Sequence, residues 1–166
     1  FLPIMLDLVR SKRLKFDPGK NNFPITLHDP CNMVRQMGIV QPQREILKVI
    51  APQFREMTPH GVDNYCCGGG SGFAIMTSPN FPQFRNKVSA RMKFDQILRA
   101  FADTIAVSSV PKYVCAPCSN CKGTIRELLK YYQATAKFNV QYGGLVELMV
   151  NALVSLDKPY LEFLAE

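Results

Sequence analysis

No apolar run in this sequence approaches the roughly 20 residues that a helix needs to span a bilayer. The opening segment FLPIMLDLV carries Asp7 and lacks the basic leader of a secretory signal peptide. We therefore expect neither a transmembrane helix nor a signal peptide in this chain. Internal repeats and low-complexity tracts are also missing, which argues against a repeat architecture.

The chain also lacks the alternation of basic and aromatic residues that is typical of nucleic-acid-binding surfaces. Its net charge is +7, but the Lys and Arg residues are dispersed, and RSKRLK (10–15) is the only dense basic cluster. A basic surface favours anionic partners in general, such as acidic proteins or an anionic lipid leaflet. Nucleic acid is not an expected partner.

What is present fits one domain with a proper core. The chain has 166 residues, 47% of them hydrophobic, so it needs no disulfide framework to fold. It begins with Phe1 and not with Met. We expect a single domain over 1–166 that is part of a longer protein.

Apolar periodicity predicts helices at 2–13, 41–51, 84–102, 122–133 and 144–156. It predicts strands at 23–31, 54–57 and 103–109, with 112–118 as a continuation of the last or a further strand. The alternation indicates an α/β fold, a mostly parallel sheet flanked by helices. The buried face predicted for the helix at 84–102 consists of Val88, Met92, Ile97, Leu98 and Phe101.

Cysteines follow three of the predicted strands. Cys31 comes just after the first, the adjacent pair Cys66 and Cys67 after the second, and Cys118 and Cys121 after a later one, at the start of a helix. Because sites in open α/β sheets gather at the carboxyl ends of strands, the five sulfurs can meet at one edge. Thiolate-rich sites favour iron–sulfur clusters or zinc.

Several alternatives stay open on the residues alone. The cysteines could be buried and inert, or could form disulfides, or could include a thioredoxin-like Cys-x-x-Cys pair, although that fold has no use for an adjacent pair about 50 residues upstream. A zinc site needs four ligands and the pattern supplies five, which favours a cluster. We interpret Cys115 as structural, with a Cys115–Cys118 ligand pair as the alternative.

Three other polar residues stand near the cysteines. His28 and Asp29 precede Cys31; a histidine at a strand end is usually structural, and catalysis is the alternative for it. Lys122 follows Cys121 and could neutralise negative charge at the site, although a solvated first-turn lysine is an equal interpretation. His60, in a polar loop, has no predicted role.

The pattern closely resembles the cysteine-rich CCG domain of heterodisulfide reductase catalytic subunits and their relatives. It runs Cys31, then Cys66-Cys67-Gly68, then Cys118-x-x-Cys121. The segments that match in family order are TLHDPC (26–31), PQREILKVI (42–50), YCCGGGSGF (65–73), ARMKFDQIL (90–98), ADTIAV (102–107), CSNCK (118–122) and GLVELMVNAL (144–153). The resemblance is nearest to the disulfide-reductase-like iron–sulfur subunits of membrane redox complexes of sulfate-reducing microbes.

The resemblance implies a [4Fe-4S] cluster, non-cubane in the best-known members, held by Cys31, Cys66, Cys67, Cys118 and Cys121. Some relatives instead bind zinc. Gly68, Gly69, Gly70 and Gly72 would let the backbone approach the cluster and offer N–H groups to it. The spacing before Cys118 is longer than in typical heterodisulfide reductases, and SSVPKYVCAP (108–117), which contains Cys115, could account for the excess. No Cys-x-x-Cys-x-x-Cys-x-x-x-Cys-Pro run is present, so the chain resembles the C-terminal domain of such a protein.

The implied function is an oxidoreductase that reduces or forms a disulfide-type bond at the cluster, working with electron-transfer subunits of a membrane-bound complex. The implied place is the cytoplasm of an anaerobe, peripherally on the cytoplasmic face of the membrane through partner subunits. Two alternatives are an electron-relay CCG subunit of a hydroxyacid or succinate-type dehydrogenase and a zinc-stabilised interaction domain.

Overall fold

The computed structural model of the chain describes residues 1–70 and 81–164. Its centre is a sheet of four parallel strands in the order β2-β1-β3-β4. The strands are β1 Ile25–Leu27, β2 Phe54–Arg55, β3 Lys112–Cys115 and β4 Val140–Gly143. Every residue of β1 and β3 is buried, as expected for central strands of a parallel sheet with both faces covered. The α/β class predicted from the sequence is confirmed.

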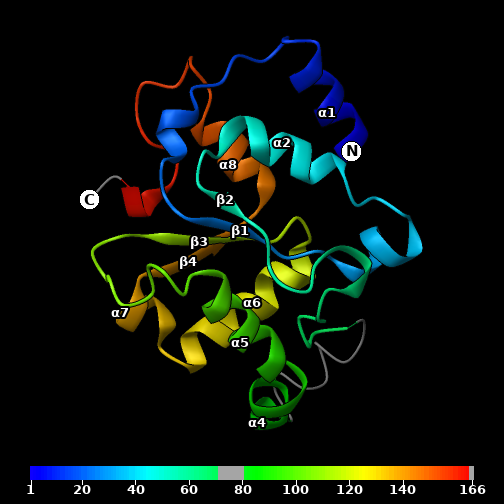
Figure 1. Ribbon diagram of the computed structural model, residues 1–166, viewed down its shortest axis with the longest axis vertical. Coiled ribbons are helices and arrows are strands. Elements are labelled where there is room, and N and C mark those ends of the chain that lie inside the picture. Colours follow the sequence, from blue (N-terminus) through cyan, green and yellow to red (C-terminus); the bar gives the residue numbers. More distant parts are fainter. Residues whose placement is uncertain (71–80, 165–166) are drawn as a thin grey trace.

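Helices cover both faces of this sheet (Figure 1). The α-helices are α1 Leu2–Arg10, α2 Pro42–Ile50, α4 Pro82–Phe84, α5 Arg91–Ala100, α6 Ser119–Tyr131, α7 Ala134–Phe138 and α8 Leu145–Asn151. Short 3-10 or π-helical turns are η1 Pro18–Asn21, η2 Asn32–Gln36, η3 Gly61–Asp63, η4 Arg85–Ser89 and η5 Glu162–Leu164. On one side α1, α2 and α8 pack over the sheet, and on the other side α5, α6 and α7 do.

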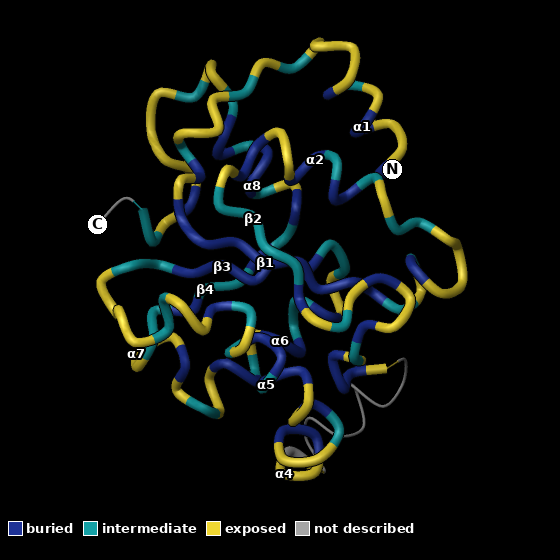
Figure 2. Tube along the Cα trace, in the orientation of Figure 1, coloured by how far each residue is buried: buried dark blue, intermediate teal, exposed yellow. Residues whose placement is uncertain are grey.

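The two layers of helices give two hydrophobic cores, which share the sheet between them. Ile25, Leu27 and Tyr113 point into the first core, whereas Val114 and Val140 point into the second. Figure 2 shows β1 and β3 as buried, β2 and the middle of β4 as intermediate, and exposed residues on the outer turns of the helices. Successive strand residues thus serve opposite layers, as the pleat requires.

The predicted strand at 103–109 is wrong. Residues 101–106 form successive turns, and Val107 is 46% exposed. β3 pairs with β1 along one edge and with β4 along the other, so it has no free edge for a further strand. The apolar periodicity did not predict β4. A short apolar run alone does not distinguish a strand from a turn that packs on the core, and Ile105 does pack in this way.

The single helix predicted over 84–102 is interrupted. Residues Arg85–Ser89 form a π-helical turn, closed by a hydrogen bond from the N–H of Ala90 to the carbonyl of Arg85 (2.9 Å). The extra residue in this turn rotates the face that follows it. Val88 and Met92 are therefore exposed, while Ile97 and Phe101 are buried as predicted and Leu98 is partly buried.

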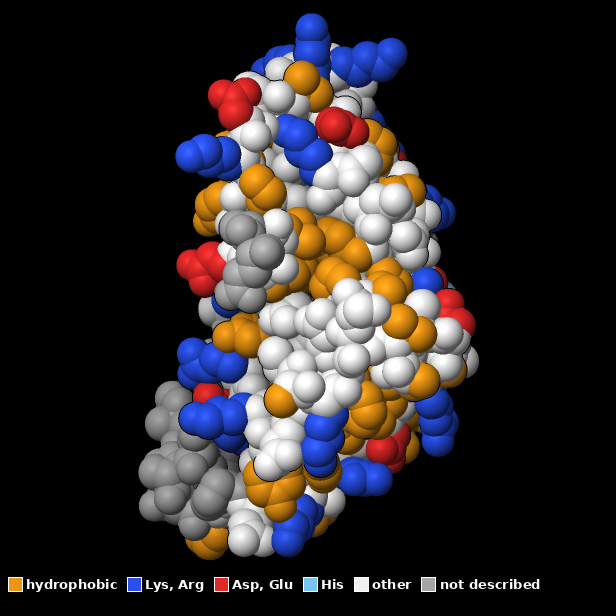
Figure 3. Space-filling model, turned by 90° about the vertical axis from the view of Figure 1, so that its left-hand side faces the viewer, with side chains coloured by type: hydrophobic (Ala, Val, Ile, Leu, Met, Phe, Trp, Pro, Cys, Tyr) orange, Lys and Arg blue, Asp and Glu red, His pale blue; other side chains and the backbone are white. Residues whose placement is uncertain are grey.

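The lengths of the helices and the distribution of basic side chains agree with what the sequence leads us to expect. In the described part of the chain, none of the helices has the length and apolar character to cross a membrane. On the face drawn in Figure 3, Lys and Arg side chains lie from one end of the molecule to the other and do not form one continuous basic surface.

Candidate metal centre

The five cysteines of the sequence pattern line one cavity of about 60 Å³ at the carboxyl edge of the sheet. They reach it from the loop after β1, the loop after β2 and the start of α6, which follows β3. The cysteines concerned are Cys31, Cys66, Cys67, Cys118 and Cys121. Parallel strands end at the same edge, so three segments far apart in sequence meet there.

The sulfurs differ in exposure. Cys67 and Cys121 are each 5% exposed, and their Sγ atoms lie 3.5 Å apart. Cys31 and Cys118 are half-buried, and Cys66 is exposed. The site therefore has a buried floor and an open side.

The thiols are crowded enough to perturb one another. Hydrogen bonding to Cys121 raises the pKa of Cys67 to about 11, and hydrogen bonding to Cys67 together with burial raises the pKa of Cys66. Such a group becomes a set of thiolates only with positive charge among the sulfurs. A soft cation supplies that charge, so the donor set fits a thiolate-bound metal or iron–sulfur cluster.

The start of α6 places Cys118 and Cys121. Cys118 is the residue that precedes the helix, with extended φ and ψ angles of −150° and 127°, and Cys121 is the third residue of the helix. Both sulfurs lie near the positive end of the helix dipole, which stabilises thiolates. The prediction that a helix begins at this Cys-x-x-Cys pair is confirmed.

The glycines after Cys67 permit close packing of the backbone. Gly68 has a φ of +80°, and a Cβ there would lie 2.7 Å from the backbone nitrogen of Ala90. A Cβ on Gly69 would overlap the side chain of Thr124. The N–H of Gly68 donates to the Sγ of Cys66 (3.3 Å), and Gly69 and Gly70 line the cavity. Gly72 lies outside the described residues.

Cys115 and Lys122 do not face the cavity. Cys115 is fully buried in the first hydrophobic core, on the other face of the sheet, where burial raises its thiol pKa. The ammonium group of Lys122 forms an ion pair with Glu147 (2.7 Å), and Lys122 is not among the residues that line the cavity.

His28 lies closer to the sulfurs than its sequence position revealed. One ring nitrogen and the Sγ atoms of Cys67 and Cys121 all lie within 4.8 Å of one another. The side chain is 1% exposed, and its Nε2 has no hydrogen-bond partner among the described residues. Burial, and then the charge of Lys93, lower its pKa well below 6.5, so the ring is neutral. Cys31, Cys66 and Cys118 line the cavity but are not part of this group of three.

Lys93, on α5, is a buried cation that the sequence reasoning missed. It is fully buried, and its ammonium group contacts Asn64 Oδ1 at 2.7 Å and Met57 Sδ at 3.6 Å. Burial lowers its pKa to about 7, and the charges of Cys67, Asp29, Cys66 and Cys121 oppose that shift. The lysine therefore acts electrostatically on the candidate centre.

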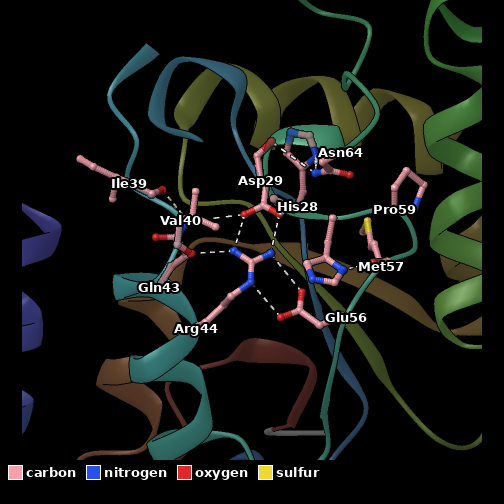
Figure 4. Close-up of polar contacts among 12 residues, drawn as sticks. His28, Asp29, Ile39, Val40, Gln43, Arg44, Glu56, Met57, Pro59 and Asn64 are labelled. Carbon is pink, nitrogen blue, oxygen red and sulfur yellow. Dashed lines mark hydrogen bonds and ion pairs between the residues drawn. The ribbon is translucent and has the colours of Figure 1, made fainter. Parts of the chain in front are cut away.

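A buried ion pair holds the loop that carries His28 and Cys31. The carboxylate of Asp29 accepts two hydrogen bonds from Arg44, at 2.8 and 2.6 Å, and one from the N–H of Gly61 at 2.6 Å (Figure 4). Arg44 also donates to Glu56 at 2.8 and 3.1 Å. These contacts tie the loop after β1 to α2 and to the segment after β2.

Comparison with known proteins gives matches across most of this chain. Residues 25–126 match the family model described as "Cysteine-rich domain" (CCG). Over 156 residues the sequence is 28% identical to the Hdr-like menaquinol oxidoreductase iron-sulfur subunit 2 of Archaeoglobus fulgidus, covering 92% of this chain and 26% of that protein. It is 26% identical to the Hdr-like menaquinol oxidoreductase iron-sulfur subunit of Archaeoglobus profundus, with the same coverage.

A shorter match, 33% identical over 67 residues, is to one subunit of the dihydromethanophenazine:CoB–CoM heterodisulfide reductase of Methanosarcina acetivorans, covering 40% of this chain and 16% of that protein. The chain spans about a quarter of the length of the two Archaeoglobus relatives. No solved structure matches it significantly.

Proposed function

This chain belongs to the family of cysteine-rich CCG domains, and we propose that it is the iron–sulfur domain of a heterodisulfide-reductase-like oxidoreductase. In this proposal Cys31, Cys66, Cys67, Cys118 and Cys121 hold a [4Fe-4S] cluster. The substrate is a disulfide or its thiols.

The observation that carries the proposal is the cavity lined by these five cysteines, from three separate loops, at one sheet edge. Zinc and a cubane [4Fe-4S] cluster each take four protein ligands, so a set of five thiols fits the non-cubane form of the cluster better than either. When bound, a [4Fe-4S] cluster would supply electrons one at a time to a sulfur–sulfur bond.

The five cysteines and Gly68 would have different roles in the site. Cys67 and Cys121 form the buried floor, where water is excluded. Exposed Cys66 and half-buried Cys31 and Cys118 border the side that a sulfur substrate could approach. The N–H of Gly68, already directed at Cys66, would stabilise negative charge on that sulfur.

The names of the relatives extend the proposal to the whole protein. The Archaeoglobus proteins are named as subunits of menaquinol oxidoreductases, and the Methanosarcina protein as a heterodisulfide reductase subunit. We propose that residues 1–166 form one CCG domain at the C-terminal end of a longer iron–sulfur protein. Its partners would be electron-transfer subunits of a membrane-bound complex, which would hold it at the cytoplasmic face.

The test is metal and sulfide analysis of anaerobically purified protein, together with electron paramagnetic resonance. About four irons and four sulfides per chain are expected for a [4Fe-4S] centre. Cys67→Ser should lose most of the iron, whereas Cys115→Ser, a substitution in the opposite core, should retain it. Equal iron in both variants would contradict the assigned ligand set.

One observation favours zinc as the second candidate. His28, Cys67 and Cys121 form a mixed nitrogen and sulfur group of the kind found in structural zinc sites. One zinc per chain with no sulfide would identify a zinc-stabilised domain. If iron is present, reduction of a disulfide by the intact complex separates a reductase from an electron relay.

A further inference from the structure

A chain of buried polar side chains leads from the candidate metal centre into the second core. His28, Asn64, Lys93 and Gln96 are 1%, 3%, 0% and 1% exposed. They come from three segments, the end of β1, the loop after η3 and the helix α5. Because buried polar groups need partners, the hydrogen bonds among these four side chains fix which atoms donate and which accept.

Gln96, the residue of this group farthest from the sulfurs in the row of contacts, fixes Lys93 as a donor. Gln96 donates from Nε2 to the carbonyl of Pro59 (2.6 Å), which leaves its Oε1 facing the ammonium group of Lys93. The other contacts of that ammonium group are Asn64 Oδ1 and Met57 Sδ, both acceptors. The three protons of an ammonium group thus have three acceptors.

Hydrogen bonds to both the oxygen and the nitrogen of the Asn64 amide fix its orientation. Its Oδ1 accepts from Lys93 at 2.7 Å, and its Nδ2 donates to the backbone carbonyl of Asp29 at 3.3 Å. Exchanging the amide oxygen and nitrogen would place a donor against a donor and an acceptor against an acceptor. The Nδ2 group therefore faces Nδ1 of His28, 3.5 Å away (Figure 4).

This contact sets the tautomer of His28. Nδ1 faces an N–H donor, so it must be the acceptor nitrogen of a neutral ring, and Nε2 must carry the proton. Nε2 has no hydrogen-bond partner among the described residues. It belongs to the side chain that lies beside the sulfurs of Cys67 and Cys121.

We propose that His28 donates a hydrogen bond from Nε2 to a metal-bound thiolate of Cys67 or Cys121, and that Asn64 and Lys93 are positioning residues for this donor. The inference rests on the proposed function, because it needs an iron–sulfur centre at these cysteines. It assigns His28 a role other than a metal ligand.

The same contacts disfavour a direct bond from His28 to iron. A ligating Nε2 needs its lone pair, so the proton would move to Nδ1 and would face the N–H group of Asn64. Histidines that bind metals instead donate their second N–H to a carboxylate, a carbonyl or water. No such acceptor is bonded to Nδ1 among the described residues.

A hydrogen bond to a cluster thiolate has a measurable consequence. It stabilises negative charge on sulfur, and the reduced cluster carries more of this charge, so the donor favours reduction. Removing the donor should leave the iron in place and make the centre harder to reduce.

The experiment uses the full chain, loaded anaerobically with iron and sulfide. In His28→Phe the reduced-to-oxidised ratio at a fixed potential should fall about tenfold, equivalent to about 59 mV for one electron. His28→Gln, which keeps an N–H donor, should recover part of the ratio. His60→Phe is the matched control, since His60 is exposed and bonds only the carbonyl of Met57 among the described residues, and it should leave the ratio unchanged.

A second measurement needs no variant. Pulsed paramagnetic resonance on the reduced wild-type protein should detect an exchangeable proton near the cluster and only weakly coupled histidine nitrogen. Strongly coupled nitrogen would overturn the inference, as would an unchanged ratio in iron-loaded His28→Phe. Wild-type protein without iron would overturn the proposed function itself, and with it this inference, so the two failures are distinguishable.

Discussion

Replacing Arg44 by Met tests whether the buried ion pair holds the loop after β1. Met removes the guanidinium group but fills a similar volume, so little of the effect will come from a cavity. The side chains of Arg44 and Asp29 are 5% and 0% exposed. Arg44→Met therefore leaves a carboxylate that water cannot reach.

The size of the effect follows from the remaining partners of Asp29. Without Arg44 the carboxylate keeps the N–H of Gly61 at 2.6 Å and a long contact from Gln43 at 3.4 Å. Removing one partner of a buried ion pair costs about 3–5 kcal/mol, because the other charge stays buried without compensation. Glu56, 29% exposed, can be hydrated and adds little.

The chain offers a matched control. Arg10 forms an ion pair with Glu45 at the surface, where the two side chains are 63% and 39% exposed. Arg10→Met should therefore cost at most about 1 kcal/mol. Urea unfolding of both variants at pH 7, followed by circular dichroism, should place Arg44→Met below the wild type in midpoint by about 2 M, for a slope of ~2 kcal/mol/M.

A cost for Arg44→Met within about 1 kcal/mol of the cost for Arg10→Met would refute this reasoning. The double variant Asp29→Asn/Arg44→Met adds a second comparison. It removes the uncompensated charge and should be more stable than Arg44→Met alone.

Three other predictions concern the candidate centre. Gly68→Ala should lower the free energy of unfolding by at least about 2 kcal/mol and should reduce bound iron, because Gly68 has a positive φ and a Cβ there would overlap Ala90. Gly123→Ala, in α6, is the control and should raise the free energy of unfolding by about 0.5–1 kcal/mol. Apart from its chain neighbours and its own helix backbone, no described atom lies within 4 Å of the place that a Cβ would take at Gly123. Cys115→Ser should bind as much iron as the wild type, but its free energy of unfolding should fall by about 1–3 kcal/mol, since a hydroxyl replaces a fully buried thiol. Iron analysis tests the first expectation and urea unfolding the second. Loss of iron would mean that the Cys115–Cys118 alternative is right. Removing the metal with a chelator should lower the unfolding temperature of the wild type, and an unchanged temperature would show that no metal contributes to folding.

The parts of the fold that the sequence predicted have a strong local signal. Ile25–Leu27 and Lys112–Cys115 are buried strands in which every residue except Lys112 is β-branched, aromatic or apolar. The helix α2 begins at Pro42, a residue suited to the first turn of a helix. The cysteine placement followed from these elements, because each pair or single cysteine comes after a strand. Topology then brought the loops together.

The parts that escaped prediction depend on distant contacts. The π-helical turn at Arg85–Ser89 changes the buried face of α5, so Lys93 and Gln96 are buried although both are polar. Periodicity assigns polar residues to the solvent side. Acceptors on distant segments, such as Asn64, 29 residues from Lys93, and Pro59, 37 residues from Gln96, make the burial of these two side chains tolerable.

His28 shows the same limit at the site. Its sequence neighbours identify a strand end and nothing more, since the partner Asn64 is 36 residues away and Cys121 lies on another element. A signal was nevertheless present, because a histidine three residues before a predicted ligand lies on the same loop as that ligand. Considering every nitrogen or sulfur donor on the predicted strand ends would have included it.

The short loop after β1 connects stability with chemistry. Within four residues it directs His28 toward the sulfurs, Asp29 toward Arg44, and Cys31 toward the cavity. A well-packed apolar pair in place of Asp29 and Arg44 could be as stable as the ion pair, but it would lack the directional hydrogen bonds that fix the loop. The two-pronged contact with Arg44 and the bond from Gly61 fix the direction of Asp29, and the peptide on either side of it follows. The geometry of the candidate centre thus depends on a salt bridge that never touches a sulfur.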